Sequence, residues 1–221
     1  AGKRSLVLDL KQKTAIAAAR RLCEQADIVV ENFRPGIMER FGLGYATLAE
    51  VNPRLVYCEN TAFGKKGPLA KRGGYDIVVQ ALTGLMAGEA KLDGDVPTYV
   101  YPAIGDYATG IQMSNAICAA LYHREKTGKG QRIDCTLMGT AMAMQTSQFT
   151  WLEMFDDEVI PPMLESLKQA RSEMKTFTQQ VGVHKMFRPA AAGNIYYRVY
   201  QTKDGFIAVG ALSMALRIKV M

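Results

Sequence analysis

Residues 12–36 read QKTAIAAARRLCEQADIVVENFRPG, and this stretch decides the fold class. Residues 12–25 carry alanines, a leucine and basic residues at helical spacing, and the apolar run 28–30 that follows predicts a strand. Before them, residues 5–9 have a strand-like pattern of their own. The stretch and its flank therefore predict a strand, helix, strand unit.

The same alternation continues along the chain. We expect a short helix at 45–51 that is stopped by Pro53, and further strands at 54–58 and 131–136. Strands that alternate with helices favour a mostly parallel sheet with helices on both faces, which is an α/β fold.

Three longer segments have helical patterns. Residues 75–86 predict an apolar helix, and residues 138–154 predict a methionine-rich one. The longest signal covers residues 107–126 and follows a strand-like segment at 100–104. Because residues 116–121 are apolar on every side, we expect this longest helix to be central and buried.

The end of the chain has a different character. Residues 161–193 are basic, rich in glutamine and punctuated by proline, which predicts a linker or an exposed connecting helix. Residues 195–200 and 206–209 then predict a hairpin. Since the chain starts and stops inside such patterns, we expect a piece truncated at both ends. The expected domains are a large one at 1–160, the linker at 161–193 and the beginning of a small one at 194–221.

Composition narrows the classes of function. The chain has 27 basic and 21 acidic residues, a formal charge of +6, and its basic residues are scattered apart from short clusters at 65–66, 71–72 and 124–129. A nucleic-acid binder would concentrate them on one element, so we expect no nucleic-acid partner and favour a small polyanionic ligand.

Cysteine and histidine usage argues against a metal site. The four cysteines show no Cys-x-x-Cys spacing and predict buried free thiols in a reducing compartment, and the two histidines form no ligand cluster. No run of about 18 apolar residues and no signal-peptide pattern is present in this sequence. We therefore expect no metal, no membrane association and a cytoplasmic location.

The first candidate site is the segment 31–36, which follows the apolar run 28–30. Ligands of α/β proteins bind at the carboxyl ends of the strands, where helix N-termini offer N–H groups to phosphate. Asn32 and Arg40 could hold amide and phosphate groups there. The alternative is that Asn-Phe-Arg-Pro-Gly is only a turn, because proline and glycine together specify one.

The second and third candidates lie before predicted helices. Asp106 could cap the helix at 107–126, or it could be a nucleophile at a strand end with backbone space beside Gly105. Asp76 could likewise be a cap, and Tyr75 could be a core residue or point its hydroxyl into a site. His123, near the end of the long helix, is expected to be a surface residue.

Seven motifs in order resemble one family. The chain is similar to family III coenzyme A transferases, the formyl-CoA transferase and carnitine CoA-transferase family, and the resemblance covers residue 3 to about residue 155. The motifs are KRSLVLDL (3–10), ADIVVENFRPG (26–36), GLGY (42–45), NPRLVY (52–57), GYDIVVQA (74–81), GDYATG (105–110) and TGKGQRID (127–134).

The resemblance implies roles for individual residues. It makes Asp106 the nucleophile, places Asn32, Phe33 and Arg40 in the CoA site, and makes Tyr75 an active-site residue. It also implies a Rossmann-like large domain, a small domain and a homodimer of two interlocked chains. The family's first CoA-binding segment and the glycine-rich loop of its oxalate-using members are not evident in this sequence.

The implied reaction transfers CoA from an acyl-CoA to a small carboxylic acid, with CoA as substrate and no permanently bound cofactor. Asp106 would form a mixed anhydride and then an aspartyl-CoA thioester. The same family includes α-methylacyl-CoA racemases, but their catalytic histidine corresponds to Tyr75, and a phenol is a poor base at neutral pH. A third alternative is an inactive fragment that only binds CoA or oligomerises.

Overall fold

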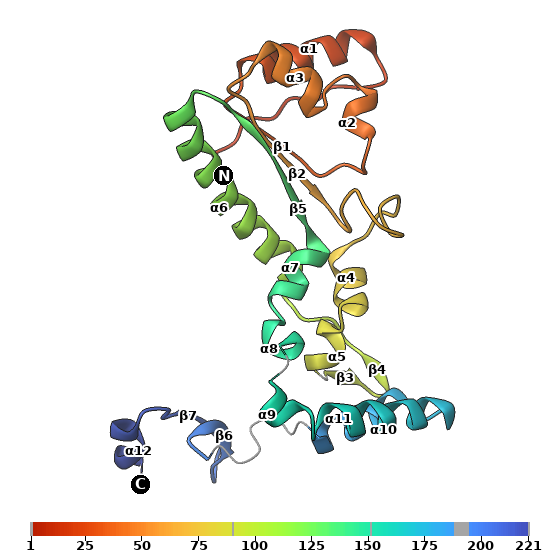
Figure 1. Cartoon of the computed structure of the whole chain (residues 1–221), viewed down its shortest axis with the longest axis vertical. Coiled ribbons are helices and arrows are strands. Elements are labelled where there is room, and N and C mark those ends of the chain that lie inside the picture. The colour runs from red at the N-terminus through yellow and green to blue at the C-terminus, as the bar shows by residue number, and fades with distance from the viewer. Residues whose placement is uncertain (1, 90, 151, 188–194, 221) are drawn as a thin grey trace. The chain divides into compact units, whose positions relative to one another are not determined.

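A computed structural model describes the chain except for residues 1, 90, 151, 188–194 and 221 (Figure 1). The chain divides into two compact units. The large unit comprises residues 1–91 and 98–149, and the small unit comprises residues 92–97 and 150–221.

The large unit contains a sheet of three parallel strands, with β2 between β1 and β5. Its strands are β1 (Ile28–Glu31), β2 (Val56–Thr61) and β5 (Gln131–Thr136), and its helices are α1 (Lys13–Gln25), α2 (Ile37–Arg40), α3 (Tyr45–Val51), α4 (Asp76–Leu82), α5 (Leu85–Glu89), α6 (Ile104–Thr127), α7 (Leu137–Ala143) and α8 (Thr146–Phe149).

Helices cover both faces of this sheet, as predicted. On one face Tyr57 of β2 packs with Leu48 of α3 and Met38 of α2, and these residues form a core cluster with Leu43 and Leu55. On the other face α6 runs along β2 and β5 (Figure 1). Side chains alternate along a strand, so the fully buried Val56 and Cys58 point away from the Tyr57 cluster. The prediction of a parallel α/β sheet is therefore confirmed.

The predicted strand at 5–9 is wrong. These residues form no strand, and the side chain of Val7 is 91% exposed. A strand needs a neighbour to accept its backbone hydrogen bonds, and within the described residues β1 pairs only with β2. The local pattern alone could not show that no partner is present there.

The strand predicted at 100–104 is also wrong. Val100 donates its N–H to Oε1 of Gln80 (2.7 Å), and its carbonyl accepts from Nε2 of the same side chain (3.1 Å). A buried side chain thus takes the hydrogen bonds that a neighbouring strand would have made. The chain then passes Pro102 and enters α6 at Ile104.

The longest predicted helix exists but is not buried all round. In α6 only Gly105, Thr109 and Ala120 are buried, whereas Tyr107 and Tyr122 are largely exposed. One side of the helix meets the sheet and α7, and apolar composition does not tell which side is covered. The expectation of a central buried helix was therefore wrong.

Two other predicted helices are interrupted. The pattern at 75–86 becomes α4 and α5, separated at Gly84, whose φ of +81° suits glycine and ends a helix. The pattern at 138–154 becomes α7, α8 and part of α9.

The prediction that the cysteines are buried needs correction, because Cys58 and Cys135 are buried but Cys118 is exposed.

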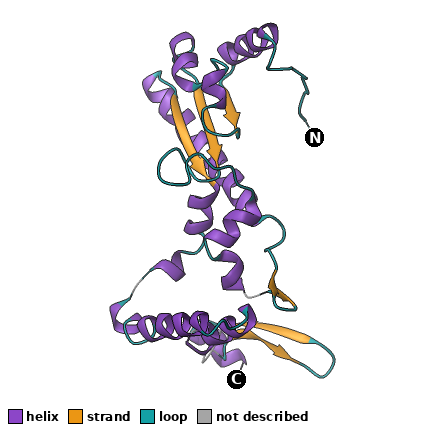
Figure 2. Cartoon of the chain, turned by 90° about the vertical axis from the view of Figure 1, so that its right-hand side faces the viewer, coloured by secondary structure: helices purple, strands orange, loops and turns teal. Residues whose placement is uncertain are grey.

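The small unit contains two antiparallel pairs of strands and four helices among its described residues (Figure 2). Strands β6 and β7 form the predicted hairpin, closed by the N–H of Thr202 donating to the carbonyl of Gly205 (2.8 Å). The domain boundaries at 160 and 194 stay a prediction. The elements are β3 (Leu92–Asp93), β4 (Val96–Pro97), α9 (Glu153–Asp156), α10 (Ile160–Ser172), α11 (Phe177–Phe187), β6 (Tyr197–Gln201), β7 (Phe206–Gly210) and α12 (Met214–Val220).

Across the described part of the chain, no helix has both the length and the apolar character needed to cross a membrane.

Candidate active site

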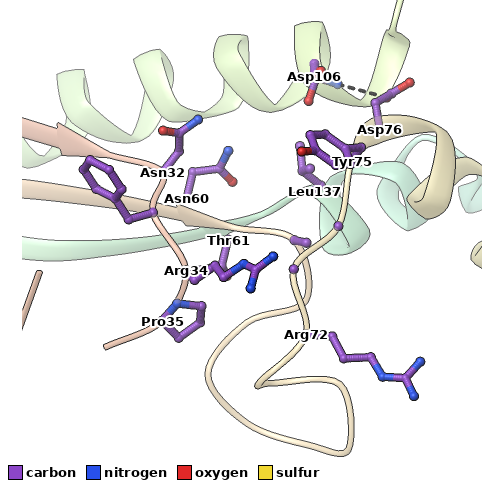
Figure 3. Close-up of a pocket in the computed structure, with 14 residues that line it drawn as sticks. Asn32, Arg34, Pro35, Asn60, Thr61, Arg72, Tyr75, Asp76, Asp106 and Leu137 are labelled. Atoms are coloured by element: carbon purple, nitrogen blue, oxygen red, sulfur yellow. Dashed lines mark hydrogen bonds between the residues drawn. The ribbon is translucent and has the colours of Figure 1, made fainter. Parts of the chain in front are cut away.

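A cavity of about 380 Å³ lies where the three parallel strands end (Figure 3). Residues that follow β1, β2 and β5 line it, which is the expected place for a ligand in an open parallel sheet. The segment before α4 and the first turn of α6 complete the wall. The lining residues are Asn32, Phe33, Arg34, Pro35, Asn60, Thr61, Ala62, Arg72, Gly73, Gly74, Tyr75, Asp76, Asp106 and Leu137.

The segment after β1 is both a turn and part of the cavity wall. Buried Glu31 accepts the N–H of Phe33 through Oε2 (2.7 Å), which folds the chain back directly after the strand. Burial raises the pKa of the Glu31 carboxyl although the hydrogen bond from Phe33 opposes the shift. Asn32 and Phe33 line the cavity as a result, so the turn and the ligand interpretations are compatible.

Arg40 lies elsewhere. It is the last residue of the single-turn helix α2, its side chain is exposed, and it is not among the residues that line the cavity. The structure therefore brings together Asn32, Phe33, Tyr75 and Asp106 but does not bring Arg40 to them. Proximity in sequence to the turn did not fix the direction in which the helix carries Arg40.

The glycine pair Gly73 and Gly74 comes directly before Tyr75 and Asp76 and lets the chain reach the cavity wall. A Cβ on Gly74 would lie 2.9 Å from the ring of Phe63, and one on Gly73 would lie 3.1 Å from Nε of Arg34, so glycine lets the chain pass close to both. Tyr75 is 81% exposed and lines the cavity together with Asp106 (Figure 3), so it is not a core residue.

Asp106 is not the cap of its helix. The helix begins at Ile104, its N-cap position is Ala103, and Ala103 supplies no side-chain hydrogen bond. Asp106 is the third helical residue, and its carboxylate has no hydrogen bond to the described residues. The cap interpretation is wrong, and the side chain remains available at the cavity wall.

The electrostatic surroundings make the Asp106 carboxyl more basic than an ordinary aspartate. Partial burial raises its pKa, and the negative charge of Asp76 raises it further. A carboxylate whose pKa is raised is less stabilised in its charged form and is therefore more basic and more nucleophilic, which suits a nucleophile or a base.

Sequence reasoning missed four polar residues of the cavity, which are Arg34, Asn60, Thr61 and Arg72. Arg34 and Arg72 both line it, and guanidinium groups bind phosphate and carboxylate oxygens with two parallel hydrogen bonds. Asn60 also lines it, with a buried Oδ1 that no hydrogen-bond donor of the described residues reaches. The signals were the position of Arg34 inside the turn at 31–36 and of Arg72 beside the glycine pair.

An ion-pair cluster holds the loop 62–74, which carries Arg72, against the sheet. Nζ of Lys65 lies 2.7 Å from the buried Glu59 carboxylate and 2.8 Å from Glu39. Arg132 of β5 lies 3.1 Å from the same Glu59 oxygen. Because the buried Glu59 carboxylate is paired with two cations, and one of them is Lys65 of this loop, the loop is attached to the sheet at this point.

In the described ranges, no three histidine, cysteine, aspartate or glutamate side chains come together as a possible metal site. The polar groups at the cavity are two arginines, amides, hydroxyls and the carboxylates of Asp76 and Asp106. This set suits an anionic ligand with a reactive carbonyl group, which arginines could hold while a carboxylate attacks.

Comparison with known proteins points the same way. The sequence pattern described as CoA-transferase family III matches residues 1–216. The acetyl-CoA:oxalate CoA-transferase of Acetobacter aceti is 40% identical over 151 residues, which are 68% of this chain and 39% of that protein. The human alpha-methylacyl-CoA racemase is 35% identical over 217 residues, 96% of this chain and 49% of the relative.

Solved structures share the fold. The hypothetical protein Rv3272 of Mycobacterium tuberculosis superimposes with a TM-score of 0.73 at 28% identity, covering 99% of this chain and 51% of that one. The chain therefore spans between about two fifths and half of the length of these relatives.

Proposed function

Because the chain belongs to CoA-transferase family III, we propose that it transfers CoA from an acyl-CoA thioester to a carboxylic acid, with Asp106 as the nucleophile. The surroundings of the Asp106 carboxylate carry this proposal. The Asp106 carboxylate has no hydrogen bond to the described residues, has a raised pKa, and shares a cavity with two arginines.

The proposed reaction begins when an oxygen of Asp106 attacks the thioester carbonyl. The C–S bond breaks, CoA leaves as a thiolate, and an acyl-aspartyl anhydride forms. The thiolate then attacks the Asp106 carbonyl carbon, which releases the acyl group as its carboxylate and leaves an aspartyl-CoA thioester. The acceptor carboxylate attacks this thioester by the same two steps in reverse, and Asp106 is regenerated.

The chemistry exchanges one thioester for another, so the protein has mainly to position the groups. The N–H of Asp106 is already donated to Asp76 and cannot also bind a developing oxyanion. We assign the binding of CoA to the part of the cavity that Arg34 and Arg72 line, the arginine side of the cavity. There Arg34 and Arg72 would bind phosphate oxygens, and Asn32 and Phe33 would contact the rest of the nucleotide or the pantetheine arm.

Racemisation is the second candidate, because the human racemase is a relative over nearly the whole chain. In this site Tyr75 lines the same cavity as Asp106, and a phenol is a weak base at neutral pH. Incubation of a 2-methylacyl-CoA in deuterium oxide distinguishes the two. A racemase incorporates deuterium at the α-carbon without an acceptor acid, whereas a transferase does not.

The remaining expectations from the resemblance belong to the same proposal. We expect an interlocked homodimer, a cytoplasmic location and no cofactor other than the CoA substrate itself. Arg40 stays a proposed CoA contact, although it lies outside the cavity that the other site residues line. Light scattering of the protein expressed from its complete open reading frame tests the dimer, which would give twice the mass of one chain.

A mutational assay tests the proposal. The protein from the complete open reading frame is screened with acyl-CoA donors against small carboxylic acids, and formation of the new thioester is followed. Asp106→Asn keeps the size of the side chain but replaces the nucleophilic carboxylate with a poorly nucleophilic amide, so transfer should fall by at least about 10³-fold with CoA binding retained. Normal transfer by Asp106→Asn would refute the proposal.

A further inference from the structure

We infer that Asp76 is a positioning residue for the nucleophile, because its buried carboxylate ties the first turn of α6 to α4 and so sets where Asp106 stands. The inference rests on the proposed function of Asp106. Asp76 itself needs no contact with the substrate to act in this way.

The contacts of Asp76 connect three parts of the large unit. The side chain is buried, its Oδ1 accepts the backbone N–H of Asp106 (3.2 Å), and its Oδ2 accepts Nε2 of Gln80 (2.5 Å). Gln80 is fully buried and in turn holds the backbone of Val100 by two hydrogen bonds. The start of α6 is therefore fixed from α4 directly, by the bond that Figure 3 shows, and also through the segment that leads into it.

Only a carboxylate satisfies both donors. Oε1 of Gln80 accepts the N–H of Val100, so its Nε2 must be the atom that faces Asp76. An asparagine at 76 would offer one acceptor oxygen, and its NH₂ group would oppose either Nε2 of Gln80 or the N–H of Asp106. One buried donor would then be left without a partner, which is unfavourable.

The helix needs this contribution from outside. The first N–H groups of a helix have no partner within it, and the N-cap residue Ala103 has no side chain that could accept one. Asp76 supplies the missing acceptor from another helix, and its negative charge at this N-terminus is favourable. The same charge lies beside Asp106, where it adds to the effect of burial in making that carboxyl more basic.

Gly105 provides the space for this arrangement. A Cβ on Gly105 would lie 2.5 Å from Oδ1 of Asp76, far inside a normal contact, so any larger residue must displace the carboxylate or the helix turn. Gly110 lies one to two turns later in the same helix, and a Cβ there meets nothing within 4 Å. Alanine at 105 and at 110 is therefore a matched pair of perturbations.

The test uses the protein from the complete open reading frame. Asp76→Asn and Gly105→Ala should each lower kcat about 10- to 100-fold, because a displacement of the nucleophile on the order of 1 Å has an effect of this size. The KM for acyl-CoA should stay within about twofold, since the arginine side of the cavity is unchanged. Gly110→Ala should keep the kcat of the wild type.

Thermal unfolding of each variant separates positioning from stability. If Asp76→Asn and Gly105→Ala lower the melting temperature but the folded fraction keeps the wild-type kcat, Asp76 has only a structural role and the inference is overturned. The same follows if kcat falls equally in Gly110→Ala. Activity retained by Asp106→Asn would instead refute the proposed function, so the two failures are distinguishable.

Discussion

Gly130→Ala should lower the free energy of unfolding of the large unit, because the added Cβ meets the backbone of a neighbouring segment. A Cβ at this position would lie 2.5 Å from the backbone carbons of Arg54 and Leu55 and closer still to the carbonyl oxygen of Leu55. No side chain can move aside, because all three atoms belong to the backbone of the segment that enters β2. The start of β5 would have to shift instead.

The magnitude follows from what the shift breaks. The N–H of Gly130 donates to the carbonyl of Pro53 (2.8 Å), and the next residue, Gln131, is the first to pair with β2. Losing one or two such hydrogen bonds costs about 0.5–1.5 kcal/mol each, and the residual overlap adds about 1–3 kcal/mol. We expect the free energy of unfolding to fall by about 2–4 kcal/mol.

Urea denaturation followed by circular dichroism measures this loss. Gly110→Ala is the reference, because its Cβ enters open space and alanine favours a helix interior by roughly 0.5–1 kcal/mol. A Gly130→Ala protein within about 0.5 kcal/mol of the wild type would refute the close approach of β5 to Leu55. It would also question the strand register that places Leu137 in the cavity wall.

Two further outcomes are expected. Because the pKa of Asp106 is raised in the folded protein, the folded state binds this proton more tightly than the unfolded state does. The free energy of unfolding therefore falls as pH rises from the ordinary aspartate range through the raised pKa. Asp106→Asn should remove that decline, which denaturant titrations between about pH 3 and 7 would measure. A variant less stable than the wild type at the upper end of this range would contradict the reasoning. A thiol reagent should label the exposed Cys118 in the native protein but reach Cys58 only in denaturant, since burial raises the pKa of Cys58 to about 12, and mass spectrometry showing equal labelling would contradict its burial.

Much of the large unit could be predicted from local patterns. The helix at 13–25, the strands around 28–31, 56–61 and 131–136, and the extent of α6 all follow from periodicity and from proline or glycine stops. The errors have a common cause. Strand formation at 5–9 and at 100–104 depends on a partner strand, and the burial of α6 depends on what covers it, neither of which is encoded locally.

The site was predicted in part for the same reason. Asn32 and Asp106 come directly after a strand or at a helix start, where α/β proteins bind ligands, and Phe33 followed from the family resemblance. All three line the cavity. The bond between Asp76 and the backbone of Asp106 joins residues 30 positions apart, and no spacing rule indicates it. The sequence left open whether Asp106 caps its own helix, whereas in the structure Asp76 supplies the acceptor for the N–H of Asp106.

Trapping of the covalent intermediate tests the central claim most directly. The protein from the complete open reading frame is mixed with acyl-CoA, quenched with hydroxylamine and digested, and the peptide that carries Asp106 is examined by mass spectrometry. The proposed mechanism predicts a hydroxamate on Asp106, formed from the anhydride or the aspartyl-CoA thioester, and none when acyl-CoA is omitted. An active protein with an unmodified Asp106, or with the hydroxamate on another residue, would contradict it.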